Sequence, residues 1–422
     1  MNSKRSIFYW LATLSFVISA CAGLPTLGNE EADTVDTPYG PQITDADHQT
    51  EVFEEILKQV ETNYIYYETG NIDWASLRQK YMDQIQTGLT YAEFDALMNQ
   101  FEAEFPTGEL TYVTRDDRIA ADTAPNTTAY GGIGAFISFQ AEDIPHVVIL
   151  DVMPGSPAEK AGLRAHDSIY SVNGDPVRLE EGGNVVQRIR GEAGTSVTLT
   201  IQSPGKGQSD IEITRSTLSG IGKVKANLLT GKDIGYILMP TTISSTTAQE
   251  VADALTQFSA NKNLKGVILD LRISNSNNNW PIEEMLTLFL DKTSIDIYSR
   301  ASNEAYVVSG QDIAGSQTIP LTVLVGEHTS GAPEIFAAAV QSSGRGIVIG
   351  SDTTGAIESP GAFPLSNGGQ GFIASASFRI GEDEIGIHGL SPKVQVEAKW
   401  DEITTGQDPV IEKAIQSFEV QP

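Results

Sequence analysis

The stretch PLTVLVGEHTSGAPEIFAAAVQ (residues 320–341) joins a buried strand, a turn of small residues and an apolar helix. The continuous apolar run of residues 321–325 is typical of a strand covered on both faces. Ser330 stands in the turn, just ahead of Glu334 and Ile335, where the apolar helix pattern begins. A strand, a tight turn and a helix in this order can present a serine nucleophile, so the stretch raises the question of a serine-type site.

Strands and helices alternate on both sides of this stretch. Residues 233–258 have the pattern of a strand, a polar loop and an amphipathic helix, and GVILDLRI (residues 266–273) is another buried strand. RGIVIGSDTTG (residues 345–355) is typical of a strand with its loop. This alternation predicts a layered α/β core over residues 218–402, followed by a C-terminal helix within residues 403–422.

A different pattern occupies residues 130–217. YGGIGAFISF (residues 130–139) places glycines ahead of strand-like alternation, and SPAEKAGL (residues 156–163) predicts a short helix. DSIYSVNGDPV (residues 167–177) predicts a strand and an Asn-Gly turn, and RIRGEAGTSVTLTI (residues 188–201) a closing strand. Several motifs in this order resemble a PDZ domain of the type found inside bacterial proteases.

The glycine-rich loop of this domain predicts a peptide site. The backbone N–H groups of Gly131, Gly132, Ile133 and Gly134 can form a nest around a terminal carboxylate. The peptide would then add as an extra strand along residues 135–139. The alternative is that these glycines serve only a tight turn.

Residues 47–125 predict a helical N-terminal domain. VFEEILKQVETNYIYY and WASLRQKYMDQI each carry one apolar stripe at helical spacing. A third segment, TYAEFDALMNQFEAEF, has Thr90 followed three residues later by Glu93, which is the spacing of a capping box. These helices form a core and carry no recognisable chemistry.

The N-terminus predicts an exported lipoprotein. Residues 1–20 have a basic start, a short apolar run and small residues, as in a signal peptide. Ile18-Ser19-Ala20-Cys21 resembles a bacterial lipobox, in which the cysteine is acylated and becomes the new N-terminus. The alternative is a plain signal peptide with a chance cysteine. Residues 21–46 are acidic and rich in glycine and proline, which predicts a flexible tether.

Composition narrows the possible partners. The chain has 27 basic and 55 acidic residues among 422, a formal net charge of −28, which disfavours nucleic acid and anionic membrane surfaces as partners. Cys21 is the only cysteine, and the five histidines show no zinc-binding spacing, so we expect no metal site. GGIG lacks the setting of a phosphate-binding loop, and we expect no cofactor.

The order of these parts over residues 48–400 resembles that of the carboxy-terminal processing peptidases, also called tail-specific proteases. The resemblance implies a PDZ domain that takes the substrate tail, a Ser–Lys dyad and backbone N–H groups that stabilise the oxyanion. In such a dyad, burial keeps the lysine neutral so that it can accept the serine proton. The predicted fold class is therefore α/β and α+β multidomain, with N-terminal helices, a PDZ domain and a peptidase-type α/β core.

The residues that the resemblance assigns to catalysis are substituted. Anchored on Glu334-Ile335, the position of the family nucleophile is Gly331, and Ser330 falls one residue early. The family lysine position holds Ala356, and the glutamine that commonly follows it matches Pro360. The Asn-Pro-Gly-Gly run that supplies oxyanion N–H groups is replaced by residues 274–279, SNSNNN.

Ser330 could act only with another base. The chain has no lysine between Lys292 and Lys393. His328 and His388 are the candidate histidines, and Asp352 could orient one of them. Close neighbours such as His328 and Ser330 rarely meet in hydrogen-bond geometry, so the default role of Ser330 is N-cap of the following helix.

These observations predict an extracytoplasmic lipoprotein of the bacterial envelope that binds C-terminal tails of exported proteins and has lost most or all peptidase activity. One alternative is an active serine endopeptidase that uses Ser330 with a base other than lysine. Another is a structural lipoprotein with a closed PDZ groove. The oligomeric state and the identity of the tail are left open.

Overall fold

The computed structural model describes residues 39–40, 45–70, 72–106, 108–123, 129–142, 144–220, 222–275, 280–380, 383–384, 389–404 and 406–419. Cys21, His388 and residues 276–279 lie outside them. The chain divides into two compact units. The first combines the N-terminal helices with residues 296–306 and 358–379, and the second holds the PDZ-like region and the α/β core.

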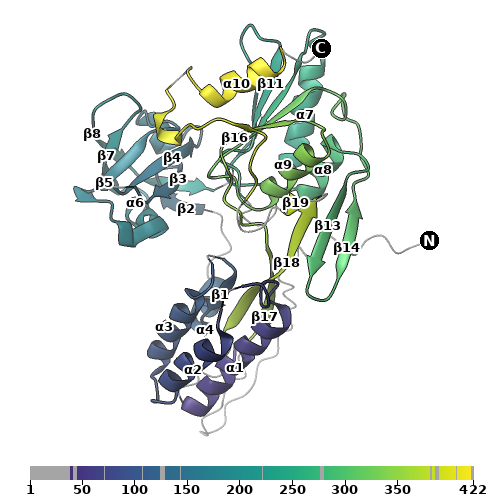
Figure 1. Ribbon diagram of the computed structural model, residues 1–422. Helices are drawn as coiled ribbons and strands as arrows, with labels where there is room; N and C mark the ends of the chain where they lie inside the picture. The colour runs from purple at the N-terminus through teal and green to yellow at the C-terminus, as the bar shows by residue number, and fades with distance from the viewer. Residues whose placement is uncertain are drawn as a thin grey trace, which may run out of the picture. The chain divides into compact units, whose positions relative to one another are not determined.

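Helices and distant strands build the first unit (Figure 1). Its elements are α1 (Ala46–Asn63), α2 (Trp74–Ile85), α3 (Tyr91–Glu102), α4 (Arg115–Thr123), β1 (Leu110–Val113), β13 (Ser294–Ser299), β14 (Asn303–Val307), β17 (Ser359–Pro364) and β18 (Gln370–Ile380). The capping box between Thr90 and Glu93 is confirmed, with both hydrogen bonds present. The sequence predicted a helical domain that ends at residue 125. In the structure, β18 from much later in the chain pairs with β1, and its residues Ile373 and Ala374 pack against the helices.

A mostly parallel sheet forms the α/β core, in the order β10 (Lys225–Leu228), β11 (Ile234–Leu238), β12 (Gly266–Asp270), β15 (Leu321–Val325), β16 (Ile347–Gly350) and β20 (Val394–Gln395). Strands β11, β12, β15, β16 and β20 run parallel, and β10 is antiparallel to β11. Ile234 packs with α10 (Pro409–Ser417), and the next residue, Gly235, faces Phe258 of α7 (Thr247–Ser259). The sheet is thus covered on both faces, with α8 (Ile282–Phe289) beside α7 and α9 (Ala332–Ser342) beside α8, and the predicted layered core is confirmed.

The PDZ-like region is an antiparallel sheet in the order β3 (Ala135–Gln140), β4 (His146–Val152), β5 (Ser168–Val172), β7 (Ser196–Gln202) and β8 (Ser209–Thr214). The short helices α5 (Pro157–Lys160), η2 (Leu179–Val185) and α6 (Val186–Ile189) close its core. The predicted Asn-Gly turn is confirmed, because Asn173 and Gly174 both have positive φ, as such a hairpin turn requires. β3 lies at the edge of this sheet.

The segment of residues 398–403 joins the PDZ-like sheet to the α/β core. The indole Nε1 of Trp400 donates to the carbonyl of Ile149 on β4, 2.9 Å away. The guanidinium of Arg272, which follows β12, lies over the Trp400 ring. Trp400 and Ile403 also share an apolar cluster with Leu150 and Ile273.

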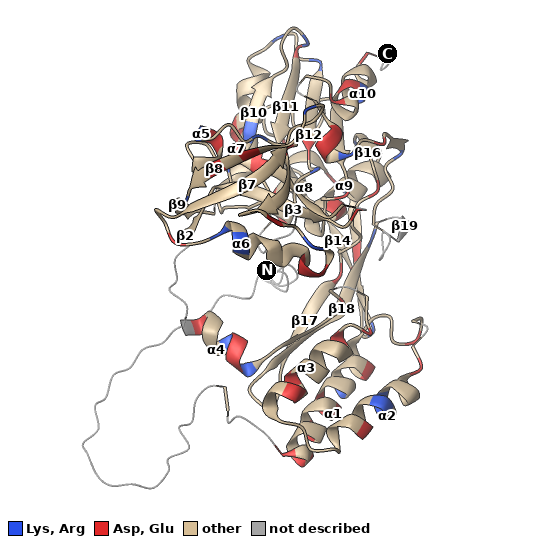
Figure 2. Ribbon diagram, turned by 90° about the vertical axis from the view of Figure 1, so that its left-hand side faces the viewer, with Lys and Arg blue, Asp and Glu red and all other residues tan. Residues whose placement is uncertain are grey.

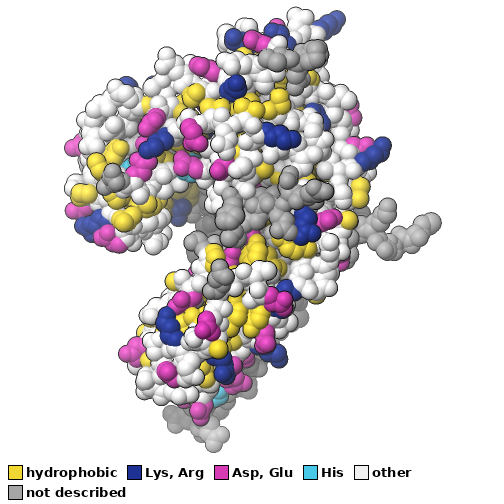
Figure 3. All heavy atoms as spheres, in the orientation of Figure 1, with side chains coloured by type: hydrophobic (Ala, Val, Ile, Leu, Met, Phe, Trp, Pro, Cys, Tyr) yellow, Lys and Arg dark blue, Asp and Glu magenta, His cyan; other side chains and the backbone are white. Residues whose placement is uncertain are grey.

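Acidic side chains are distributed over the surface. Figure 2 shows them on helices and strands of both units, and Figure 3 shows them scattered among uncharged atoms on one face. No helix in the described part of the chain is both long enough and apolar enough to cross a bilayer.

Candidate functional site

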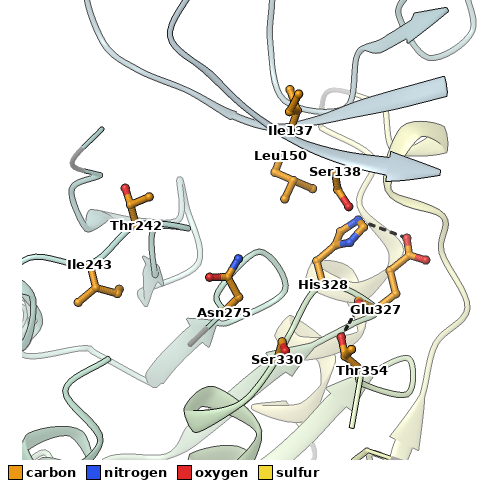
Figure 4. A pocket seen from close by; sticks show the side chains of 10 residues that line it. All are labelled: Ile137, Ser138, Leu150, Thr242, Ile243, Asn275, Glu327, His328, Ser330 and Thr354. Atoms are coloured by element: carbon orange, nitrogen blue, oxygen red, sulfur yellow. Dashed lines mark hydrogen bonds and ion pairs between the residues drawn. The ribbon is translucent and has the colours of Figure 1, made fainter. Parts of the chain in front are cut away.

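A pocket of about 750 Å³ opens where parallel strands of the core end (Figure 4). Loops that follow β11, β12, β15 and β16 line it, together with strands β3 and β4. The carboxyl ends of parallel strands are the usual place for ligand sites in α/β sheets. The lining residues are Ile137, Ser138, Leu150, Thr242, Ile243, Asn275, Glu327, His328, Ser330 and Thr354.

Ser330 lines this pocket but does not cap α9. The helix begins at Ala332, and its N-cap is Gly331, so the predicted N-cap role of Ser330 is wrong. The physical reason is that Gly331 has a φ of 72°, a conformation that glycine adopts without strain, and this moves the turn one residue along. The Ser330 N–H donates to the carbonyl of Ser274, 3.2 Å away.

The buried carboxylate of Glu334 accepts hydrogen bonds from both loops that carry Gly331 and Ala356. Its Oε2 accepts the N–H groups of Gly331 at 2.6 Å and of Ala356 at 3.2 Å. Its Oε1 accepts the hydroxyl of Thr353 at 2.5 Å and the N–H of Gly355 at 2.7 Å. Burial raises the pKa of Glu334, while these hydrogen bonds oppose that rise by favouring the charged form.

Glu334 was not among the predicted site residues. The signal that could have found it is its position three residues after the N-cap, where a glutamate reaches back to the turn. Within the described residues, it is the carboxylate that connects the loop after β15 to the loop after β16.

His328 does not serve Ser330 as a base. Figure 4 shows its ring directed toward Glu327 and away from Ser330. Burial lowers the pKa of His328 to about 4, so the imidazole is neutral near pH 7. Its Nε2 lies 3.5 Å from Oε1 of Glu327 and has no hydrogen-bond partner among the described residues. The predicted orienting residue, Asp352, instead accepts hydrogen bonds from Ser391 and Gln395.

Two threonines fix the loops around Ser330. The hydroxyl of the buried Thr329 donates to the carbonyl of Leu271, 2.9 Å away, and accepts from the N–H of Gly326 at 3.0 Å. The hydroxyl of Thr354 donates to the carbonyl of Glu327, 2.9 Å away, and its N–H donates to the carbonyl of Thr329. The loop that carries Ser330 is therefore tied to both neighbouring loops.

In the PDZ-like region, the four residues predicted to bind a terminal carboxylate lie in different structural settings. Gly131 and Gly132 belong to β2 (Ala129–Gly132), which pairs with β9 (Ser216–Ser219). Ile133 is buried. Gly134 has a φ of 82°, and a Cβ atom added at this position would lie only 2.4 Å from the Cβ of Ser156. The loop therefore requires glycine at position 134, and carboxylate binding there stays a prediction.

No group of three or more histidine, cysteine or acidic side chains that could hold a metal ion occurs in the described ranges. The titratable side chains that line the pocket are Glu327 and His328. The described residues that line the pocket provide no paired nucleophile and base.

Residues 233–396 match peptidase family S41, residues 148–203 match the PDZ domain and residues 45–103 match the Tricorn protease C1 domain. The carboxy-terminal processing protease CtpA of Bacillus subtilis is 32% identical over 294 residues, 68% of this chain and 60% of that protein. The carboxyl-terminal-processing protease of Synechocystis sp. is 26% identical over 425 residues, 98% of this chain and 93% of that protein.

A solved structure of the photosystem II D1 C-terminal processing protease superimposes with a TM-score of 0.60 at 24% identity. The superposition covers 87% of this chain and 96% of that chain. This likeness shows a common fold of N-terminal helices, PDZ domain and α/β core.

Proposed function

Because the chain is a homologue of the carboxy-terminal processing proteases of peptidase family S41, we propose that it binds C-terminal tails of exported proteins and has lost, or nearly lost, proteolysis. The main observation that supports this proposal is that the backbone N–H groups of Gly331 and Ala356 both donate to Oε2 of Glu334. Gly331 and Ala356 stand at the positions that the sequence assigns to nucleophile and lysine. In this chain, those positions hold neither a hydroxyl nor an amine.

The chemistry of acyl transfer supports this proposal. A serine attacks a peptide bond only when a base takes its proton, and arginine stays protonated in proteins. No described side chain accepts a hydrogen bond from the Ser330 hydroxyl, and His328 is directed away from it. Peptide binding requires neither a nucleophile nor a base, because the peptide would contact the edge of β3 and the walls of the pocket.

The proposed location is the extracytoplasmic face of a bacterial membrane, with acylated Cys21 as the anchor and residues 21–46 as the tether. Its support is the lipobox-like sequence before Cys21. The protein would then act as a scaffold, decoy or regulator that holds tails, without cutting them.

Peptide binding and cleavage test the proposal together. We expect wild-type protein to bind apolar-ended decapeptides with a free carboxylate and to bind the amidated versions at least about tenfold more weakly, because the loop N–H groups recognise a charge. Mass spectrometry should find no cleavage by wild type or by Ser330→Ala. Cleavage that Ser330→Ala abolishes would instead establish an active serine endopeptidase, and absence of binding to both peptides would indicate a closed groove.

A further inference from the structure

Glu327 lines the site pocket without a cationic partner among the described residues. Its neighbour is His328, whose Nε2 lies 3.5 Å from Oε1 of Glu327 (Figure 4). His328 is buried and neutral near pH 7, because burial lowers its pKa to about 4. The negative charge of Glu327 is therefore not neutralised by the side chain that it faces.

Two other carboxylates act on Glu327 and do have partners. Glu142 pairs with Lys399 at 2.9 Å, and Asp401 lies 3.2 Å from Nε2 of His146 and 3.3 Å from the hydroxyl of Ser168. The charges of Asp401 and Glu142 raise the pKa of Glu327 further, after burial as the main cause, and Lys399 opposes them. Among the charges that act on Glu327, the two carboxylates therefore outnumber the one lysine.

A cation would offset what Glu327 loses on partial burial. A half-buried carboxylate gives up part of its hydration, and a positive group within about 4 Å restores a favourable interaction. Three apolar side chains, Ile137, Leu150 and Ile243, line the same pocket. Such walls suit the alkyl stem of lysine or arginine, whose charged end then reaches a carboxylate.

The edge strand brings a bound peptide to this carboxylate. Ile137 and Ser138 of β3 line the pocket together with Glu327. A strand advances about 3.3 Å per residue. With its carboxylate near Gly134, a peptide along β3 would therefore present to the pocket a residue roughly three to six places before its end.

We propose that Glu327 is a specificity-determining residue that selects tails carrying lysine or arginine about three to six residues before an apolar C-terminus. This inference rests on the proposed function, since it concerns which tails the PDZ edge and the pocket accept. It assigns to the pocket a recognition role that does not depend on Ser330.

Fluorescently labelled decapeptides test the inference in the full chain without its signal peptide. The peptides share an apolar, free C-terminus and differ only by lysine, glutamine or glutamate at one of the third to sixth places from the end. At about 50 mM salt, we expect the best lysine peptide to bind roughly five- to tenfold more tightly than its glutamine counterpart, and glutamate to bind most weakly. Glu327→Gln should reduce the lysine preference over glutamine to within about twofold. Glu412→Gln, an exposed change on α10, is the matched control and should keep the preference.

Equal binding of the lysine and glutamine peptides by wild type would overturn the inference and leave the proposed function intact. Loss of the preference in Glu412→Gln to the same extent as in Glu327→Gln would also overturn it, because net charge would then explain the effect. Failure of every peptide to bind would contradict the proposed function itself, and the inference with it.

Discussion

At the scale of single residues, Glu334 determines the shape of the site. Four hydrogen-bond donors converge on its two oxygens, and the side chain is fully buried. A carboxylate can accept all four, whereas an amide presents an NH2 group to half of them. These hydrogen bonds connect the loop that carries Ser330 to the loop that carries Thr354, so Glu334 stabilises the position of both residues at the pocket.

Glu334→Gln should lower the free energy of unfolding by about 3 kcal/mol, because two buried donors would lose their acceptor. Urea denaturation followed by circular dichroism measures this, with the exposed change Glu412→Gln as control, expected within about 0.5 kcal/mol of wild type. Equal stability of the two variants would show that Glu334 does not hold the loops.

His328 predicts a pH dependence with a definite sign. Its folded-state pKa of about 4 lies below the ordinary value of 6.5, so the unfolded chain binds the proton more readily than the folded one. The stability associated with neutral His328 is complete above pH 6.5 and is lost as the pH falls toward 4. Between these values, wild type should lose up to about 3 kcal/mol more than His328→Gln, measured by urea denaturation at each pH. Parallel pH profiles for the two proteins would contradict the buried, neutral imidazole.

At the scale of elements, the segment of residues 398–403 connects the PDZ-like sheet to the core. Trp400 hydrogen-bonds to Ile149 through Nε1, accepts from Nδ1 of His166 through its carbonyl and packs under Arg272. Arg272 immediately precedes Ile273 and Ser274 in the loop that reaches the pocket. One indole ring thus contacts both the sheet that would bind a tail and the loop beside Ser330.

Trp400→Ala should cost about 3 to 5 kcal/mol, because it removes a buried ring as well as the Nε1 hydrogen bond. Trp400→Phe keeps a ring and should cost less, which separates packing from hydrogen bonding. Calorimetry measures both variants. A Trp400→Ala melting profile identical to that of wild type would show that the segment does not stabilise the second unit.

At the scale of the whole molecule, the chain builds its first unit from pieces far apart in sequence. Strand β18 pairs with β1 from Leu110↔Ile373 to Val113↔Gln370. Phe363, Leu365, Ile373 and Ala374 belong to the same apolar cluster as the helices. The N–H of Ile65 also donates to the carbonyl of Ala374, 3.0 Å away.

A fragment of residues 45–125 should therefore fail to unfold cooperatively, because its helices leave an apolar face exposed to water. Adding a synthetic peptide of residues 358–379 should raise its helix content, measured by circular dichroism. Cooperative thermal unfolding of the fragment alone would contradict this expectation.

The sequence by itself determined the succession of helices and strands, the PDZ-like motifs and the buried parallel strands, because apolar periodicity is a local property. The resemblance to a peptidase family also assigned Gly331 and Ala356 to the positions of a catalytic dyad, and that assignment stays a prediction. These inferences compare residue types along the chain and need no knowledge of which strands meet.

Only the tertiary structure decided the contacts between distant segments. Glu334 could be recognised as the link between the loops after β15 and β16 only after these strands were placed side by side. The N-cap at Gly331 instead of Ser330 depends on a backbone angle. That Glu327 has no cationic partner among the described residues follows from the neutral imidazole of His328 and from the pairing of Lys399 with Glu142. Each depends on long-range packing, which a pattern read along one chain does not specify.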